Sequence, residues 1–483
     1  MVFSSFRFFA FLAAVLVFLA LPLSRRTKKI GLCIASCLFY AAWDYRYLAL
    51  LLLVSGVDFA CAARISATTA DRVRRRWLLL SIVTSFGLLA WFKYAGFFLE
   101  NANGLLRITG YELPMLRVFL PAGISFYTFK SMSYTIDVYR RVIRPVDSLI
   151  EYAMFVTFFP DLIAGPIVRA ALFLPQLDRD IGPTAARLRA GGSLFVIGLG
   201  KKLLVADQCA AVADAIFAAP ATWSCFDAWC GLIAYALQIY CDFSGYSDMA
   251  IGTAQMIGYD LPENFRMPYL ASDIADFWRR WHITLSMWLR DYLYIPLGGN
   301  RKGARRTYAN LLLTMLLGGL WHGASWNFVT WGFLHGIALA LHRAWRSAFP
   351  SVRLPRLIST PVTTLFVILC WVPFRQTSWA GMRSMFLALS GFGHGNAVWF
   401  PAVLGWSLLL VIGGHVIGVL VGHEKPGRLL TAIDAERYQN PISGSQLIFG
   451  IASVRGAFFF ATVLLTIYFF GATATSPFIY FRF

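Results

Sequence analysis

Apolar stretches long enough to cross a lipid bilayer recur from one end of this sequence to the other. A spanning helix needs roughly 20 mostly apolar residues, and hydrophobic residues make up 58% of the 483 residues. Only 14% of the residues are charged, whereas a soluble globular protein carries about 25%. The sequence therefore predicts an all-α polytopic membrane protein, in which residues 1–483 form a single membrane-embedded domain.

The apolar runs differ in length, and several are interrupted. We expect about 10–12 transmembrane helices with re-entrant and interfacial helices among them, because irregular backbone survives at membrane depth only inside protein or a water-filled cavity. The polar stretch at 422–447 is typical of a loop. The runs lie near residues 8–23, 30–43, 47–63, 77–98, 115–136, 150–168, 192–206, 228–257, 308–343, 361–374, 399–421 and 456–474.

The net charge of +19 is distributed as short clusters of Lys and Arg between apolar runs. Such clusters are typical of loops that follow the positive-inside rule, whereas a nucleic-acid groove would interleave basic and aromatic residues, so we expect no nucleic-acid partner. The first three clusters follow the first, third and fifth runs. They therefore share one side, and the N-terminus is predicted to lie outside the cytoplasm. The clusters are Arg25, Arg26, Lys28 and Lys29; Arg72, Arg74, Arg75 and Arg76; and Arg140, Arg141 and Arg144.

The eight cysteines include no CxxC pair, and most of them lie in or beside apolar runs. Cysteine behaves there as a small hydrophobic residue. We therefore expect neither a disulfide framework nor a metal site.

The segment 276–297 is rich in tryptophan. Its large apolar residues recur at alternating spacings of three and four, which predicts one amphipathic helix. On such a helix Arg279, His282 and Ser286 would share a second face, with Arg290 one turn further on. An interfacial helix with tryptophans at the headgroup boundary would explain the apolar stripe. It would not explain a histidine among arginines, where protonation is disfavoured.

His322 lies in an apolar run that has no charged residue between Arg306 and Arg343. Small residues surround it in the sequence, so another stretch of backbone or a thin ligand could approach closely. A histidine that bonds across helices is the structural alternative, but a titratable residue inside a membrane is by default a functional candidate. We therefore expect a functional His322 and a structural His335. The small residues are Gly318, Gly319, Gly323, Ala324 and Ser325.

Two carboxylates, Asp242 and Asp248, lie in an otherwise apolar run. Buried carboxylates are costly unless they are paired, and Arg279, Arg280 and Arg290 are candidate partners. A structural ion-pair network and a direct role in chemistry both fit this pattern.

Three long motifs resemble those of the membrane-bound O-acyltransferase family, and most closely those of its bacterial alginate-acetylating branch. They are WRRWHITLSMWLRDYLYIPLGGNRKG at 278–303, GGLWHGASWNFVTWGFLHG at 318–336 and DFSGYSDMAIG at 242–252. The similarity extends to LPAGISFYTF at 120–129, FPDLIAGPIVR at 159–169 and SPFIYFRF at 476–483, and it weakens between about 375 and 455.

The resemblance implies that His322, in WHG, is the catalytic histidine and that His282, in RWH, is the second signature residue. It implies a ring of tilted helices around a thin central region, with funnels from both membrane faces that meet near these histidines. A neutral His322 would act as general base, or a transient acetyl-histidine would form. His282 or a backbone N–H would orient the thioester or stabilise the oxyanion. We expect the site to be supported by Asp242, Asp248, Arg279, Trp321, Ser286 and Arg290.

The resemblance further implies transfer of an acetyl group from cytoplasmic acetyl-CoA across the inner membrane, for O-acetylation of an alginate-like exopolysaccharide. A periplasmic SGNH-type acetyltransferase and the polysaccharide secretion machinery would be partners, and no cofactor would be bound permanently. The basic loops would contact anionic phospholipid. Two alternatives stay open: D-alanyl transfer from a carrier protein, as in the related teichoic acid system, and a transporter or flippase without acyl chemistry.

Overall fold

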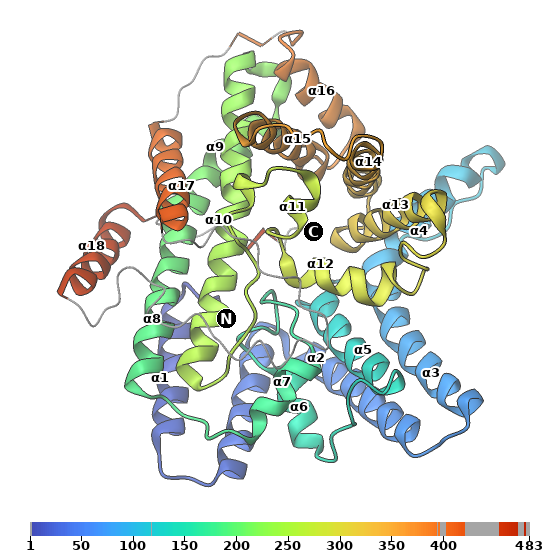
Figure 1. Ribbon diagram of the computed structural model, residues 1–483, viewed down its shortest axis with the longest axis vertical. Helices are drawn as coiled ribbons and strands as arrows, with labels where there is room; N and C mark the ends of the chain where they lie inside the picture. Colours follow the sequence, from blue (N-terminus) through green and yellow to red (C-terminus); the bar gives the residue numbers. More distant parts are fainter. Residues whose placement is uncertain are drawn as a thin grey trace. The chain divides into compact units, whose positions relative to one another are not determined.

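The computed structural model describes residues 2–116, 118–393, 395–396, 402–420, 454–471 and 478–479, which Figure 1 shows as a ribbon. The regular secondary structure of these residues is entirely helical. This confirms the all-α class that the apolar runs predicted. The predicted loop at 422–447 lies outside the described residues.

The described residues form two compact units. Their boundaries fall within α8 (Ala185–Gly200), within α10 (Cys225–Ile257) and between Pro262 and Glu263. The first unit contains those within Met1–Phe195 and Met249–Pro262. The second contains those within Val196–Asp248, Glu263–Leu429 and Ile451–Phe483. Every candidate site residue lies in the second unit. The single-domain organisation stays a prediction.

Each unit also has helices of its own. In the first unit these are α1 (Phe6–Ala20), α2 (Arg25–Ser66), α3 (Asp71–Leu89), α4 (Ala95–Leu106), α5 (Ile124–Tyr139), α6 (Leu149–Thr157) and α7 (Ala170–Phe173). In the second they are α9 (Asp207–Ala218), α11 (Ile274–Trp278), α12 (Ile283–Leu289), α13 (Gly303–His322), α14 (Trp326–Ala348), α15 (Arg356–Arg375), α16 (Trp379–Leu389), α17 (Ala402–Leu420) and α18 (Val454–Phe470).

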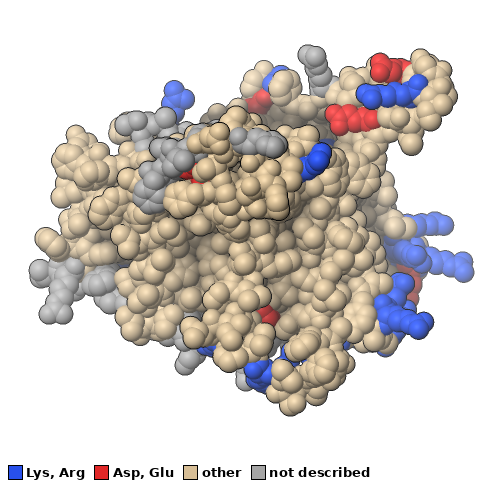
Figure 2. All heavy atoms as spheres, turned by 90° about the horizontal axis from the view of Figure 1, so that it is seen from above, with Lys and Arg blue, Asp and Glu red and all other residues tan. Residues whose placement is uncertain are grey.

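Four helical stretches are long and apolar enough to cross a membrane, within the part of the chain that the structure describes. They are Arg25–Ser66, Asp71–Thr109, Arg356–Arg375 and Ala402–Leu420. On the face shown in Figure 2, charged side chains are sparse and gather toward the edges of the view. Both observations agree with a multi-pass membrane protein, while the number of 10–12 crossings stays a prediction.

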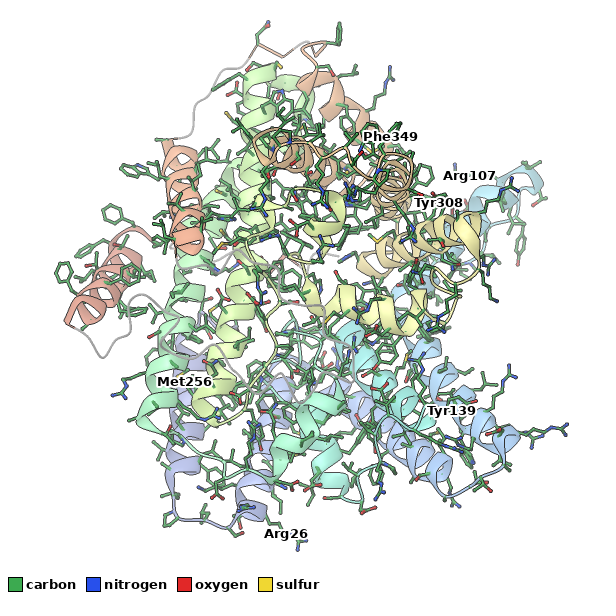
Figure 3. The ribbon with its side chains drawn as sticks, in the orientation of Figure 1. Arg26, Arg107, Tyr139, Met256, Tyr308 and Phe349 are labelled. Carbon is green, nitrogen blue, oxygen red and sulfur yellow. The ribbon has the colours of Figure 1, made fainter. Side chains whose placement is uncertain are left out.

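The basic clusters of the first unit lie close to one another. Arg74, from the second cluster, donates to the carbonyl oxygen of Tyr139 at 2.5 Å and stacks over its ring, directly before the third cluster. Lys29, from the first cluster, pairs with Glu151 at 2.6 Å, and Glu151 follows the third cluster in the sequence. Arg26 lies at the outer end of α2 and points away from the ribbon in Figure 3. The side of the membrane on which the clusters lie stays a prediction.

Two apolar runs of the sequence are joined in one helix, and one run is divided. Asp44 has extended backbone inside α2 (φ −159°, ψ 112°), so the predicted runs at 30–43 and 47–63 are two helical segments separated by a kink. The run at 308–343 is divided between α13 and α14. This division places His322 at the end of a helix.

The segment 276–297 is not one helix, so the predicted helical faces in it are wrong. α11 ends at Trp278, and α12 begins only at Ile283. A π-helical segment then covers Arg290–Tyr294. Two of the tryptophans are also not at an exposed boundary, because Trp281 is 2% and Trp288 is 4% exposed. Trp278 is half-buried, so the middle of the apolar stripe packs inside the protein.

Candidate active site

His322 is the last residue of α13, where the sequence WHGAS makes a short connection to the next helix. α13 ends there because Gly323 has extended backbone (φ −163°, ψ 148°). Ser325 then caps α14, and its side chain accepts from the backbone N–H of Phe328 at 3.5 Å. The His322 side chain is buried, with 3% exposure.

Glycines allow the backbones of α13 and α14 to meet. A Cβ atom at Gly319 would overlap the carbonyl oxygen of Phe328, and one at Gly332 would overlap that of Met315. Small residues allow this close approach between membrane helices. The prediction that the small residues admit neighbouring backbone is therefore confirmed, and the backbone belongs to α14.

We predict that Gly332→Ala separates α13 from α14 and lowers the melting temperature of the purified protein. The reason is that the added methyl group meets backbone, which cannot move aside as a side chain can, and overpacking of this kind costs about 1–3 kcal/mol. Gly318→Ala is the matched control, since its Cβ atom would lie 3.2 Å from the flexible end of Leu289. Equal melting temperatures for the two variants would contradict this account of the helix contact.

Aromatic rings surround His322. The ring centroids of Trp321 and Trp331 lie 5.0 Å from the imidazole centroid, and that of Phe374 lies 5.4 Å away. Trp331 stands perpendicular to it, at 89°. The small residues beside His322 in the sequence therefore do not leave it in open space, because helices α14 and α15 supply large rings that the local sequence does not reveal.

His282 lies in the turn between α11 and α12 and has left-handed backbone (φ 42°, ψ 54°). This conformation is strained for a residue other than glycine and needs support from its surroundings. Asn264 supplies it. The Asn264 side-chain oxygen lies 3.1 Å from His282 Nδ1 and accepts from the Thr284 hydroxyl at 2.8 Å, and its carbonyl oxygen accepts from the N–H of Ile283 at 2.9 Å. The His282 ring is thereby fixed in a fully buried position.

The structure brings His282 and His322 to the same tryptophan. The centroid of Trp321 lies 6.2 Å from that of His282 and 5.0 Å from that of His322. On another side, Phe243 of α10 packs edge to face on His282, at 4.6 Å and 84°. The two histidines and Trp321, which the sequence selected, therefore form one buried cluster.

Asp242 is part of a buried ion-pair network beside this cluster. Lys202 Nζ lies 2.8 Å from Asp207 Oδ1 and 2.8 Å from Asp242 Oδ1, and all three side chains are at most 4% exposed. The second oxygen of Asp242 accepts from the backbone N–H of Ile479 at 2.7 Å. The carboxylate therefore holds α10 to the π-helical segment Lys201–Ala206 and to a residue near the end of the chain.

The predicted arginine partners of the two carboxylates are wrong. Lysines take their place, and Asp248 pairs with Lys201 at 2.6 Å. The arginines pair with acidic residues close to them in sequence: Arg279 with Asp276 at 3.5 Å, Arg280 with Asp276 at 3.1 Å, and Arg290 with Asp291 at 2.6 Å.

The remaining predicted support residue, Ser286, has a local role. Its hydroxyl donates to the carbonyl oxygen of Trp281 at 3.3 Å, which links α12 to the turn before it. Within the described residues, no group of three or more His, Cys, Asp or Glu side chains is placed to hold a metal ion.

Sequence reasoning missed four residues that shape the cluster: Asn264, Lys202, Trp331 and Phe374. Trp331 and Phe374 lie in the apolar runs at 308–343 and 361–374, where nothing in the local sequence distinguishes them from other apolar residues. Asn264 lies between Glu263 and Phe265, just before the tryptophan-rich segment. The polarity of Asn264 so close to that long motif was the one signal in the sequence that could have indicated its role.

Comparison with known proteins shows which family this chain belongs to. Residues 145–373 match the model of MBOAT, the membrane-bound O-acyltransferase family. The chain is 44% identical over 395 residues to the Probable alginate O-acetylase AlgI of Pseudomonas aeruginosa, covering 80% of this chain and 75% of that protein. The chain belongs to the membrane-bound O-acyltransferase family. It is therefore an O-acyltransferase, which disfavours the transporter alternative.

Other relatives are named for a different acyl group or a different acceptor. The peptidoglycan O-acetyltransferase of Helicobacter pylori is 40% identical over 77% of this chain and 74% of its own length. The teichoic acid D-alanyltransferase of Streptococcus thermophilus is 30% identical over 46% of this chain and 57% of its own length. Similarity is thus higher and more extensive with the named O-acetylating relatives.

Proposed function

We propose that this protein is a membrane-bound O-acetyltransferase that moves an acetyl group from cytoplasmic acetyl-CoA across the inner membrane, for O-acetylation of an alginate-like exopolysaccharide. One observation carries the proposal: two buried imidazoles share Trp321 in a chain that is 40–44% identical to relatives named as alginate and peptidoglycan O-acetylating proteins.

His322 is the general base in this proposal. It takes the proton of an acceptor hydroxyl while the hydroxyl oxygen attacks the thioester carbonyl carbon, and it returns the proton to the leaving thiolate. Burial among aromatic rings supports this role, because a desolvated imidazole stays neutral and can accept a proton at neutral pH. His282, held by Asn264 on the far side of Trp321, orients the acyl donor. A transient acetyl-histidine at His322 is the variant in which the imidazole itself attacks.

The membrane location gives the reaction its direction in this proposal. Acetyl-CoA is made in the cytoplasm and the polymer is modified in the periplasm, so the enzyme hands the acetyl group to a periplasmic SGNH-type acetyltransferase of the secretion machinery. The N-terminus is periplasmic, and the basic clusters then lie on the cytoplasmic side, against anionic phospholipid.

D-alanyl transfer from a carrier protein is the second candidate, because the chain also resembles teichoic acid D-alanyltransferases. Deletion of the gene separates the two candidates. The proposal expects loss of base-labile acetate from the exopolysaccharide, measured by proton NMR, with restoration from a plasmid. Unchanged acetate, or loss of ester-linked D-alanine in its place, would overturn it.

A further inference from the structure

Three aromatic rings with polar nitrogens pack against one another next to His322, and one of them, Trp331, also contacts the His322 ring. His335 and Trp331 come from α14, and Trp278 comes from the end of α11. The ring centroids are 4.8 Å apart for Trp331 and His335, 5.2 Å for Trp278 and His335, and 5.7 Å for Trp278 and Trp331. We call these three residues the ring triad, and all of them belong to the second unit.

The ring triad carries buried N–H groups that have no acceptor among the described residues. Both nitrogens of His335 and the indole nitrogens of Trp278 and Trp331 are buried, and none has a hydrogen-bond partner among the described residues. A buried polar group without a hydrogen-bond partner lowers the stability of the folded protein. His335 is 0% exposed and Trp331 1%, so bulk water does not reach either side chain.

Packing alone does not explain these residue types. Phe277 and Phe366 complete the surroundings of His335, at centroid distances of 6.0 and 5.6 Å. A third phenylalanine at position 335 would fill the same space without a desolvation cost. His415, another buried histidine of this unit, bonds the carbonyl oxygen of Val411 at 2.8 Å. His335 has no such bond within the part of the chain that the structure describes, so its ring nitrogens are available to a ligand.

The position of the ring triad indicates which ligand atom it would meet. Trp331 packs against His335 on one side and stands perpendicular to the His322 imidazole, 5.0 Å away, on another. Two indoles and a neutral imidazole together present three N–H donors and one acceptor. Such a set matches an oxygen that accepts hydrogen bonds, next to the residue that accepts the proton.

We propose that the ring triad binds the carbonyl oxygen of the acyl group and stabilises the negative charge that develops on it. This inference rests on the proposed function. As the acceptor oxygen bonds to the carbonyl carbon, the π electron pair moves to the carbonyl oxygen and the proton moves to His322. When the carbonyl re-forms, the C–S bond breaks and the thiolate leaves with that proton. Fixed N–H donors aimed at such an oxygen lower the barrier without reorganisation.

The test replaces two of the three N–H donors and keeps an aromatic ring at each position, with His335→Phe and Trp278→Phe. We expect kcat for acetyl transfer to fall roughly 10²-fold, as loss of one oxyanion donor does, while KM changes less than about twofold. The melting temperature of His335→Phe should be equal or higher, because an unsatisfied polar group is removed. His335→Gln, which restores an N–H, should recover part of kcat.

Trp345→Phe is the matched control, since Trp345 lies on the same helix and is 47% exposed; it should keep full activity. Full activity of His335→Phe and Trp278→Phe would overturn the ring triad as a carbonyl site. A parallel loss of activity and melting temperature, without rescue by His335→Gln, would also overturn it and assign a packing role. Acetylation of the polymer by His322→Ala cells would refute the proposed function instead, so the two failures are distinguishable.

Discussion

His322→Ala is expected to abolish polymer acetylation while the protein remains folded and inserted. The general base is lost in this variant, and proton transfer by a positioned side chain contributes about 10²–10⁴-fold to rate. The acetyl content of the exopolysaccharide from a deletion strain that carries the variant should equal that of the empty strain. The measurement is ester-bound acetate by proton NMR, alongside the amount of monodisperse protein in detergent.

The control for this variant is a histidine of the next helix. His342 is half-buried on α14 and lies 3.6 Å from Asp273, away from the aromatic rings around His322. His342→Ala should restore acetylation fully. An active His322→Ala protein would remove the basis of the proposed mechanism, since no other residue of the cluster is assigned that proton transfer.

Lys202→Met is expected to have the largest effect on stability. The substitution removes the cation that lies between the buried carboxylates Asp207 and Asp242, and breaking a buried ion pair costs about 3–5 kcal/mol. Activity should fall as well, because Phe243, next to Asp242, packs on the His282 ring. The melting temperature in detergent and the acetylation assay measure the two effects.

Lys201→Met is the matched control for this prediction. Lys201 adjoins Lys202, but its pair with Asp248 is partly exposed, at 30% and 19% for the two side chains, so its loss should matter less. The double variant Lys202→Met with Asp242→Asn should recover part of the stability, because one uncompensated charge is removed. If Lys202→Met melts at the wild-type temperature, the buried network does not hold α10 in place.

The sequence predicted the helices better than it predicted their ends. Apolar runs locate α2, α10 and α15 because a membrane helix must be apolar over most of its length. The break at His282 was missed, because Asn264 and the unit's tertiary structure stabilise a left-handed residue that no local pattern indicates. The end of α13 at His322 could have been expected from Gly323, but a glycine inside a run of membrane-helix residues is also common.

In the candidate site, too, the sequence predicted the residues of the motifs but not their tertiary contacts. His322 and His282 were selected by their motifs, and Trp321 indeed contacts both. The partners of Asp242 were assigned wrongly, because arginines are numerous in the neighbouring motif, whereas Lys202 lies 40 residues earlier, within the apolar run at 192–206. His335 was assigned a structural role on sequence grounds. Only its packing against Trp331, without a hydrogen bond from the described residues, indicates another function.

Purified protein and labelled acetyl-CoA test whether acetyl transfer takes place at His322. Wild-type protein and His322→Ala, each in lipid nanodiscs, are incubated with acetyl-CoA that carries ¹⁴C in the acetyl group, and release of free CoA is followed over time. We predict CoA release and label transfer by the wild-type protein and neither by His322→Ala. Equal release by both proteins, or none by the wild type in the presence of its periplasmic partner and polymer, would contradict it.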